Sequence, residues 1–228
     1  MLKIKIIVLL LVFAIALAVF SFYNFFTVIN VSEFTLVDSY SLPFDFAKVK
    51  MVLVRNDVME EIIAHEHGEI IEKKWNKFVI SGDRPFRDGV DIEGSGDFLI
   101  SKQEPDAGKL LLKFKQQISL TKSSINSVVK LIEPVGYIKA IETTMEVCPQ
   151  EKETFVKTRI HVKYERLIPK NMVEMVNKKV KESVSQTLAT NKEVVSSLVE
   201  KYADKKFIFP VPLFKKHNST SGKFLFLH

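Results

Sequence analysis

Cysteine is nearly absent from this chain of 228 residues, since Cys148 is its one example. A single cysteine excludes an internal disulfide framework and any zinc site built from several cysteines. The folded part must therefore rely on an apolar core, and apolar residues make up 46% of the chain. With 26% charged residues, the composition excludes both an intrinsically disordered chain and a protein that crosses a membrane many times.

Acidic residues are scarce in the last third of the chain. Residues 150–228 hold 8 of the 27 Asp and Glu residues but 16 of the 33 Lys and Arg residues, so the formal net charge of +6 originates there. Such a basic bias attracts anionic surfaces, either phospholipid headgroups or nucleic acid. Because the sequence contains no nucleic-acid motif, we expect lipid headgroups rather than nucleic acid as the partner.

The longest apolar run lies at the N-terminus. Lys3 and Lys5 precede an unbroken apolar stretch over 6–20, and apolar and weakly polar residues continue it to Ile29. About 23 helical residues at 1.5 Å each span about 34 Å, enough to cross a hydrocarbon core of about 30 Å. The lysines before the run favour a cytoplasmic N-terminus. We therefore interpret residues 1–30 as a single-pass signal-anchor that places the domain on the extracytoplasmic side.

The alternative for this segment is a cleaved signal peptide. Ala16, Leu17 and Ala18 form the small–x–small pattern that precedes a cleavage point, and cleavage there would give a secreted protein. The apolar stretch continues past this point, so cleavage would leave a very hydrophobic new N-terminus. This continuation favours the uncleaved anchor.

Hydropathy periods predict one α+β domain over 31–205. A strand is expected first, and two short helices are expected between residues 44 and 64, separated at Asn56–Asp57. Residues 81–97 hold four of the eight glycines and are interpreted as a loop with at most a short edge strand. Alternation with a period of two residues predicts strands at 31–42, 109–120 and 154–166, and composition with the bounding turns predicts further strands at 69–80, 98–101, 125–132 and 137–147.

A long helix is predicted after Pro169, which suits the first turn of a helix. Apolar residues recur from Met172 to Tyr202 at spacings of three, four and seven residues. This spacing is typical of a helix of about 33 residues with one apolar stripe, and its other face is rich in lysine.

This order of elements resembles the helix-grip fold of the START-like (SRPBCC) superfamily, which includes polyketide cyclases, plant allergen-type lipid binders and coenzyme Q-binding proteins. The resemblance rests on "YSLPFDFAKVKMVL", a strand followed by proline and the first helix, and on "RIHVKYERLIPKNMVEMV", the last strand running into the long helix. It implies a curved antiparallel sheet of about six or seven strands wrapped on the C-terminal helix. It also implies an elongated apolar cavity between them.

Such a cavity would bind a lipid-like ligand, because burying each CH₂ group contributes about 0.8 kcal/mol. The alternative for every candidate lining residue is a place in a solidly packed core. The candidates come from the two strands with the clearest alternation and from the first half of the long helix: Leu110, Leu112, Phe114, Ile160, Val162, Tyr164, Met172, Val176 and Val180.

His65, His67 and Glu69 are close in sequence, as metal ligands often are. On a helix the two histidines point about 200° apart, and the spacing supplies no third ligand, so a solvated helix end is favoured and no metal site is predicted. Glu142 and Glu146 are expected on the exposed face of their strand rather than as an acid or base inside the cavity.

The C-terminal segment, residues 206–228, is expected to be a tail outside the domain. Its prolines forbid a regular helix, and its large apolar residues are bracketed by lysines. It could dock on the domain, bind a partner or enter an anionic leaflet. The residues predicted to contact a membrane surface are Lys205, Lys206, Phe207, Phe209, Phe214, Lys215 and Lys216.

Together these features predict a membrane-anchored protein that binds a hydrophobic ligand without catalysis, cofactor or metal. Cys148 has no histidine near it in sequence to activate it, so no catalytic residue is assigned. One alternative is a cyclase or aromatase-type enzyme on the same fold, which would need an acid–base pair inside the cavity. The other is a structural or interaction module with a solid core and no space for a ligand of about 300 Å³.

Overall fold

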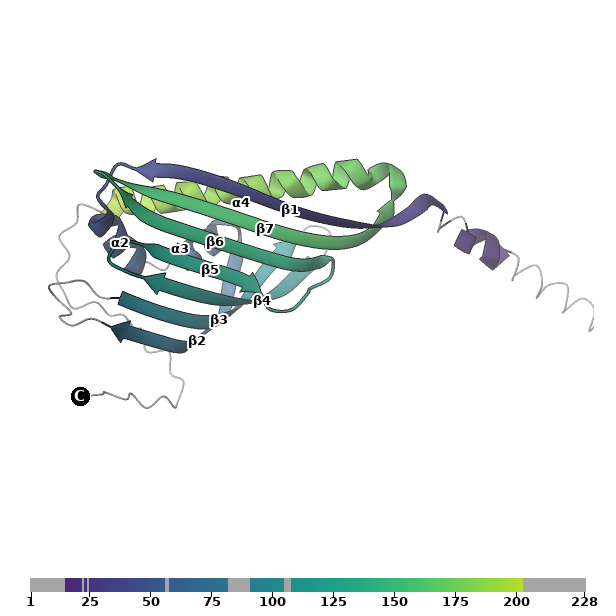
Figure 1. Ribbon diagram of the computed structural model, residues 1–228. Coiled ribbons are helices and arrows are strands. Elements are labelled where there is room, and N and C mark those ends of the chain that lie inside the picture. Colours follow the sequence, from purple (N-terminus) through teal and green to yellow (C-terminus); the bar gives the residue numbers. More distant parts are fainter. Residues whose placement is uncertain are drawn as a thin grey trace, which may run out of the picture.

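A computed structural model describes residues 15–21, 23, 25–55, 58–81, 91–104 and 108–202 (Figure 1). In this part of the chain, one sheet of seven strands is covered by two short helices and one long C-terminal helix. The predicted α+β architecture is therefore confirmed. The N-terminal residues 1–14, the Asn56–Asp57 break and the tail from residue 203 onward lie outside the described residues.

All neighbouring strands in the sheet are antiparallel, in the order β1-β7-β6-β5-β4-β3-β2. The strands from β2 to β7 follow one another as a meander, and β1 returns to pair with β7. The elements in chain order are β1 (Thr27–Leu42), α2 (Phe46–Arg55), α3 (Val58–His65), β2 (Gly68–Ser81), β3 (Asp91–Glu104), β4 (Gly108–Leu120), β5 (Ile125–Leu131), β6 (Ile138–Gln150), β7 (Glu153–Pro169), the 3₁₀ turn η1 (Lys170–Met172) and α4 (Val173–Tyr202).

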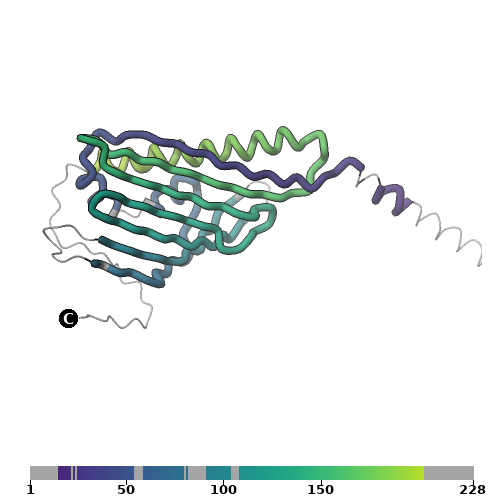
Figure 2. Tube along the Cα trace, in the orientation of Figure 1, coloured from purple at the N-terminus to yellow at the C-terminus, as the bar shows by residue number. Residues whose placement is uncertain are grey.

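The long helix α4 runs alongside β1 and β7, and the short helices lie near its C-terminal end (Figures 1 and 2). Its last three turns are fully packed, because Val195, Leu198 and Val199 are buried in one cluster with Val49 and Val52 of α2. Leu120, Ile125, Val147 and Val156 complete this cluster from the strands. The C-terminal third of α4 is thus fixed between α2 and the sheet.

Two strand predictions were wrong at their boundaries. β1 begins at Thr27 rather than at Val31, because residues 27–30 pair with the end of β7 from Pro169 to Arg166. Residues 91–97, interpreted from sequence as part of a loop, are the first half of β3, and they pair with both β2 and β4.

The glycines of β3 explain the second error. A Cβ atom at Gly94 would lie 3.2 Å from the Trp75 ring, and one at Gly96 would lie 2.8 Å from the Lys74 carbonyl oxygen. These glycines therefore allow the Trp75 indole to lie against the strand, and they do not mark a turn.

Among the residues that the structure describes, no helix is both long enough and apolar enough to cross a membrane. Residues 15–21 are helical and exposed, and β1 starts six residues later.

We expect the packing of α4 to dominate the stability of the domain. Replacing Leu198, which is 7% exposed, with alanine should lower the free energy of unfolding by about 2–5 kcal/mol. Leu111, which is 49% exposed on β4, is the matched control, and Leu111→Ala should change this free energy by less than about 1 kcal/mol. Urea denaturation of both variants measures the difference, and equal effects would contradict this description of the core.

Candidate functional site

A cavity of about 590 Å³ lies between the concave face of the sheet and the first half of α4. Strands β2 to β7 form its floor, and α3 closes one side with Met59, Ile62 and Ile63. The helix α4 contributes only short side chains to its roof: Val180, Ser183, Val184, Thr187 and Asn191. Val180 and Val184 pack against Ile160 of β7, and the cavity lies between these short side chains and the rest of the floor.

Six of the nine residues predicted to line a cavity do line it: Leu112, Phe114, Ile160, Val162, Tyr164 and Val180. The other three lie elsewhere. Leu110 packs against the cluster around Ile63 and Phe98, Met172 is 37% exposed in η1, and Val176 lies one turn before the cavity begins. Contact of the six with a ligand remains a prediction.

Sequence reasoning missed the wall that β2 and β3 supply. Trp75, Phe78, Ile92 and Ile100 line the cavity there, and Gly94 gives access to the rings. The aromatic residues of 69–80 indicated a strand, but the assignment of 91–97 to a loop left out the neighbouring strand β3, against which these rings pack.

The rings in this wall pack edge to face. The Trp75 ring centroid lies 6.1 Å from that of Phe98 and 6.2 Å from that of Phe78. The Lys73 ammonium lies 5.6 Å from the Trp75 centroid and 5.5 Å from the Phe98 centroid, within range of a cation–π interaction. Burial lowers the pKa of Lys73 below the ordinary lysine value. One edge of the cavity therefore combines aromatic rings with a cation.

Lys102 and Glu66 form an ion pair near the same edge of the cavity. Lys102 Nζ lies 3.4 Å from Glu66 Oε2, and both residues line the cavity. Glu66 Oε1 is buried and accepts no hydrogen bond from the residues that the structure describes. The lining of the cavity therefore includes one buried carboxylate oxygen that is unpaired among the described residues.

Polar side chains also cross the middle of the cavity. Gln116 Nε2 donates to Ser127 Oγ at 3.2 Å, and both side chains are buried. Thr143 and Thr158 lie on the neighbouring strands β6 and β7. Facing them on α4, Asn191 interrupts the apolar stripe between Leu188 and Val195, a pattern visible in the sequence that could have indicated a polar residue in the cavity.

The start of α4 is fixed by hydrogen bonds rather than by apolar packing. Asn177 Oδ1 accepts from Asn30 Nδ2 and from Ser32 Oγ, each at 2.7 Å, and also from the Tyr164 hydroxyl. No residue of α4 before Val184 is fully buried. This network therefore connects β1 and β7 to the helix, and it orients the Tyr164 side chain at the cavity wall.

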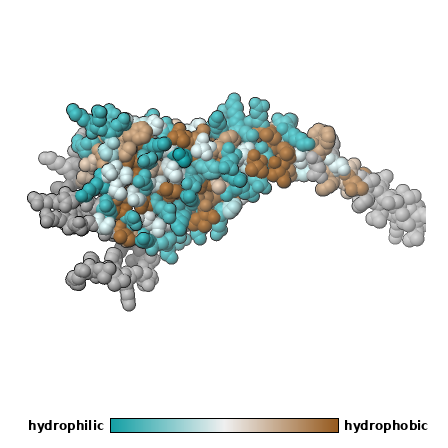
Figure 3. All heavy atoms as spheres, in the orientation of Figure 1, coloured by the Kyte–Doolittle hydropathy of each residue, from teal (hydrophilic) through white to brown (hydrophobic). Residues whose placement is uncertain are grey.

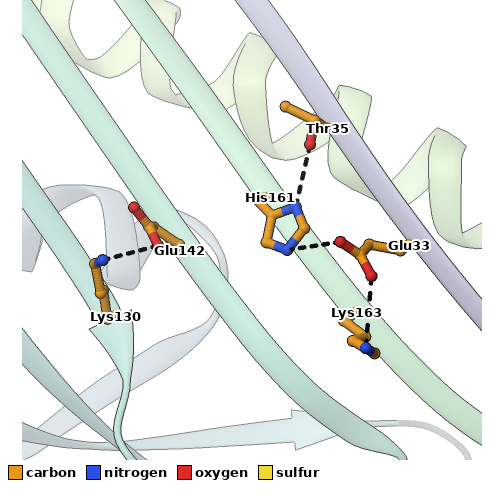
Figure 4. A network of polar contacts seen from close by, with 6 residues as sticks. All are labelled: Glu33, Thr35, Lys130, Glu142, His161 and Lys163. Carbon is orange, nitrogen blue, oxygen red and sulfur yellow. Dashed lines mark hydrogen bonds and ion pairs between the residues drawn. The ribbon is translucent and has the colours of Figure 1, made fainter.

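The outer face of the sheet carries a separate polar network (Figure 4). His161 Nδ1 lies 3.1 Å from Thr35 Oγ1, and both His161 and Lys163 lie 3.6 Å from carboxylate oxygens of Glu33. Glu142 pairs with Lys130 at 3.0 Å on this face, as its place in the alternation predicts. Such exposed pairs contribute little to stability and face away from the cavity.

In the described part of the chain, no three His, Cys, Asp or Glu side chains gather as metal ligands would. His65 ends α3 and is exposed, and His67 adopts a left-handed backbone with φ of 58° in the turn before β2.

The topology described above is that of the helix-grip fold, so the resemblance to the START-like superfamily is confirmed at the level of the fold. The signature is a meander that closes on the first strand, two short helices after that strand, and a long C-terminal helix. No family model matches the chain, and no curated protein matches it either.

Solved structures with a similar arrangement include aromatase/cyclases. The di-domain aromatase/cyclase StfQ of the steffimycin pathway is 14% identical with a TM-score of 0.47, over 76% of this chain and 52% of that protein. This chain thus spans about half the length of StfQ. The ZhuI aromatase/cyclase from Streptomyces sp. R1128 is 8% identical with a TM-score of 0.43, over 75% of this chain and 95% of that one.

A third similar structure has no stated function. It is a protein from Staphylococcus aureus that is 8% identical with a TM-score of 0.45, over 77% of this chain and 99% of that protein.

Proposed function

We propose that this chain binds a hydrophobic small molecule in the cavity and that the apolar segment before β1 attaches it to a membrane. The observation that supports binding is the cavity itself, whose volume of about 590 Å³ is typical of small-molecule sites. Its lining is mainly aliphatic and aromatic, so a ligand would bind chiefly by burying apolar surface. A module with a solid core between helix and sheet does not fit this volume.

Filling the cavity should prevent binding. Thr143 lies on its floor, so Thr143→Phe should occupy the space and reduce affinity for the apolar probe diphenylhexatriene at least about tenfold. The adjacent Thr144 points to the outer face of the same strand, which makes Thr144→Phe a matched control with unchanged affinity. Probe fluorescence would be titrated with the full chain in nanodiscs, with empty nanodiscs subtracted.

If wild-type nanodiscs add no probe fluorescence above the empty ones, ligand binding in this cavity is excluded. Equal loss in both threonine variants would place the probe somewhere else.

Membrane attachment is supported by the sequence of residues 1–30 and by the surface near the start of β1. Ile29 and Leu167 are paired across β1 and β7 and are 61% and 45% exposed. Met172 and Met175, which follow β7 in the chain, are 37% and 44% exposed. In Figure 3, brown, hydrophobic residues gather at this end of the molecule. Lys170 Nζ lies 5.3 Å from the ring centroid of Phe25, which is 70% exposed. Aromatic rings beside basic side chains suit a membrane interface.

Charges within the apolar segment should prevent attachment. Substituting both Ile15 and Leu17 with lysine should move the protein from the carbonate-resistant membrane fraction to the soluble fraction, since each central lysine opposes insertion by about 2.5–3.5 kcal/mol. Ser21→Lys, nearer the end of the run, should leave the protein in the membrane. Recovery of the wild-type chain in the soluble fraction would refute the anchor, and protease accessibility from the extracytoplasmic side would test its orientation.

A proton-transfer enzyme is the second candidate function, and the Glu66–Lys102 pair favours it. A carboxylate with one unpaired buried oxygen beside a cavity can accept a proton from a bound ligand, while Lys102 holds its other oxygen. Two solved structures with this fold are named as aromatase/cyclases, but the assignment to this chain depends on its own residues.

Comparing ligands bound to two forms of the protein separates binding from catalysis. If Glu66 transfers a proton, Glu66→Gln should retain an unreacted ligand whose mass or double-bond position differs from that of the ligand extracted from the wild type. Mass spectrometry and NMR of organic extracts measure this difference. The same ligand in both proteins would leave binding as the function and reject Glu66 as a catalytic residue.

A further inference from the structure

Asn191 is a buried amide that the rest of the protein leaves unsatisfied. The residue is 8% exposed and lines the cavity from the roof. Within the described part of the chain, no group donates a hydrogen bond to its Oδ1 atom, which is itself buried. Buried amides in folded proteins are normally paired, so an unpaired amide that faces a cavity requires an explanation.

Several polar side chains of the cavity lining already have a partner, although Glu66 Oε1 is unpaired like Asn191 Oδ1. Gln116 donates to Ser127, and Lys102 donates to Glu66. The hydrogen-bonding capacity of Asn191 is therefore available to a molecule in the cavity.

Asn191 is the last residue that α4 contributes to the cavity lining, on the side of α2. The residues that α4 contributes to the lining run from Val180 to Asn191, a length of about 16 Å along the helix axis. Immediately beyond, Val194 and Val195 enter the solid cluster with α2. On the floor, Thr158 lies between Ile160, which shares a cluster with Leu188, and Val156, which shares one with Val195, so Thr158 stands at the level of Asn191.

We propose that the ligand carries a hydroxyl group and that this group is bound by Asn191 at the α2 end of the cavity. This inference rests on the proposed function of the cavity and specifies the ligand class. A hydroxyl group donates to Oδ1 and accepts from Nδ2, so it satisfies both halves of the amide at once. The apolar skeleton of the ligand then extends along the roof toward Val180.

Other polar groups match this position less well. A ketone or an ether only accepts, which would leave Oδ1 unpaired. A carboxylate would bring a charge to the end of the cavity opposite Val180, whereas the lining cations Lys73 and Lys102 come from β2 and β3. The site therefore selects a neutral alcohol over an anion or a ketone.

A pair of ligands with the same alkyl chain tests this selection. 1-Decanol and decyl methyl ether would each displace diphenylhexatriene from the full chain in nanodiscs, with empty nanodiscs as the blank. The alcohol should bind about tenfold more tightly than the ether, because only the alcohol donates to Oδ1.

Substitution of Asn191 should abolish the preference without abolishing binding. In Asn191→Leu the amide is replaced by an apolar group of similar size, so the alcohol and the ether should bind with affinities within about twofold of each other. Ser185→Leu is the matched control, since Ser185 is exposed on the same helix, and this variant should keep the full preference.

The outcomes separate the two proposals. If both ligands displace the probe equally from the wild type, Asn191 does not select a hydroxyl group, although the cavity still binds apolar molecules. If the probe itself does not bind, the proposed function fails as well. If Asn191→Leu keeps the preference, another group recognises the hydroxyl and the assignment to Asn191 is overturned; should that variant not fold, Asn191→Ala replaces it under the same criterion.

Discussion

The cavity depends on how α4 is held above the sheet, because the helix is fixed at its two ends by different interactions. At its C-terminal end, Val195, Leu198 and Val199 pack into a solid cluster with α2. At its start, Asn177 accepts hydrogen bonds from β1 and β7 in place of apolar contacts. Between these two attachments the helix carries short side chains. In its middle, Val184 and Leu188 pack on Ile160 of β7, and the cavity remains between the helix and the rest of the sheet.

The absence of a side chain also shapes the floor of the cavity. Gly94 in β3 has no side chain of its own, and the rings of Trp75 and Phe78 lie against it. The aromatic residues therefore form the wall of the cavity at the β2 edge instead of filling its centre. The charged side chains of Lys73, Glu66 and Lys102 gather at this edge as well, whereas neutral polar groups occupy the middle. The cavity is therefore charged at its β2 edge and neutral elsewhere, and this difference favours one orientation for an amphiphilic molecule.

Most of the fold was predictable from sequence, because alternation and the 3.6-residue period report which face of an element is buried. The strand predicted at 154–166 is β7, and the helix predicted to end at Tyr202 ends there. β3 was not predictable in the same way, since its glycines are explained only by the Trp75 ring on the neighbouring strand. The cavity was only partly predictable: Val184 and Val195 belong to one apolar stripe, yet only Val184 lines the space. That difference depends on what lies opposite each residue, which no local pattern reports.

The pairing of β1 with β7 has a consequence for how the chain reaches this structure. Thr27 pairs with Pro169, and among the described strands β7 is the one neighbour of β1. β1 is therefore synthesised long before its partner β7, while the meander from β2 to β7 assembles from sequence neighbours. Contacts between such distant segments close slowly, because the loop-closure entropy is lost before any contact compensates for it. Until β7 has been synthesised, the apolar residues of β1 remain unpaired. During this interval their exposed apolar surface can aggregate or bind a chaperone.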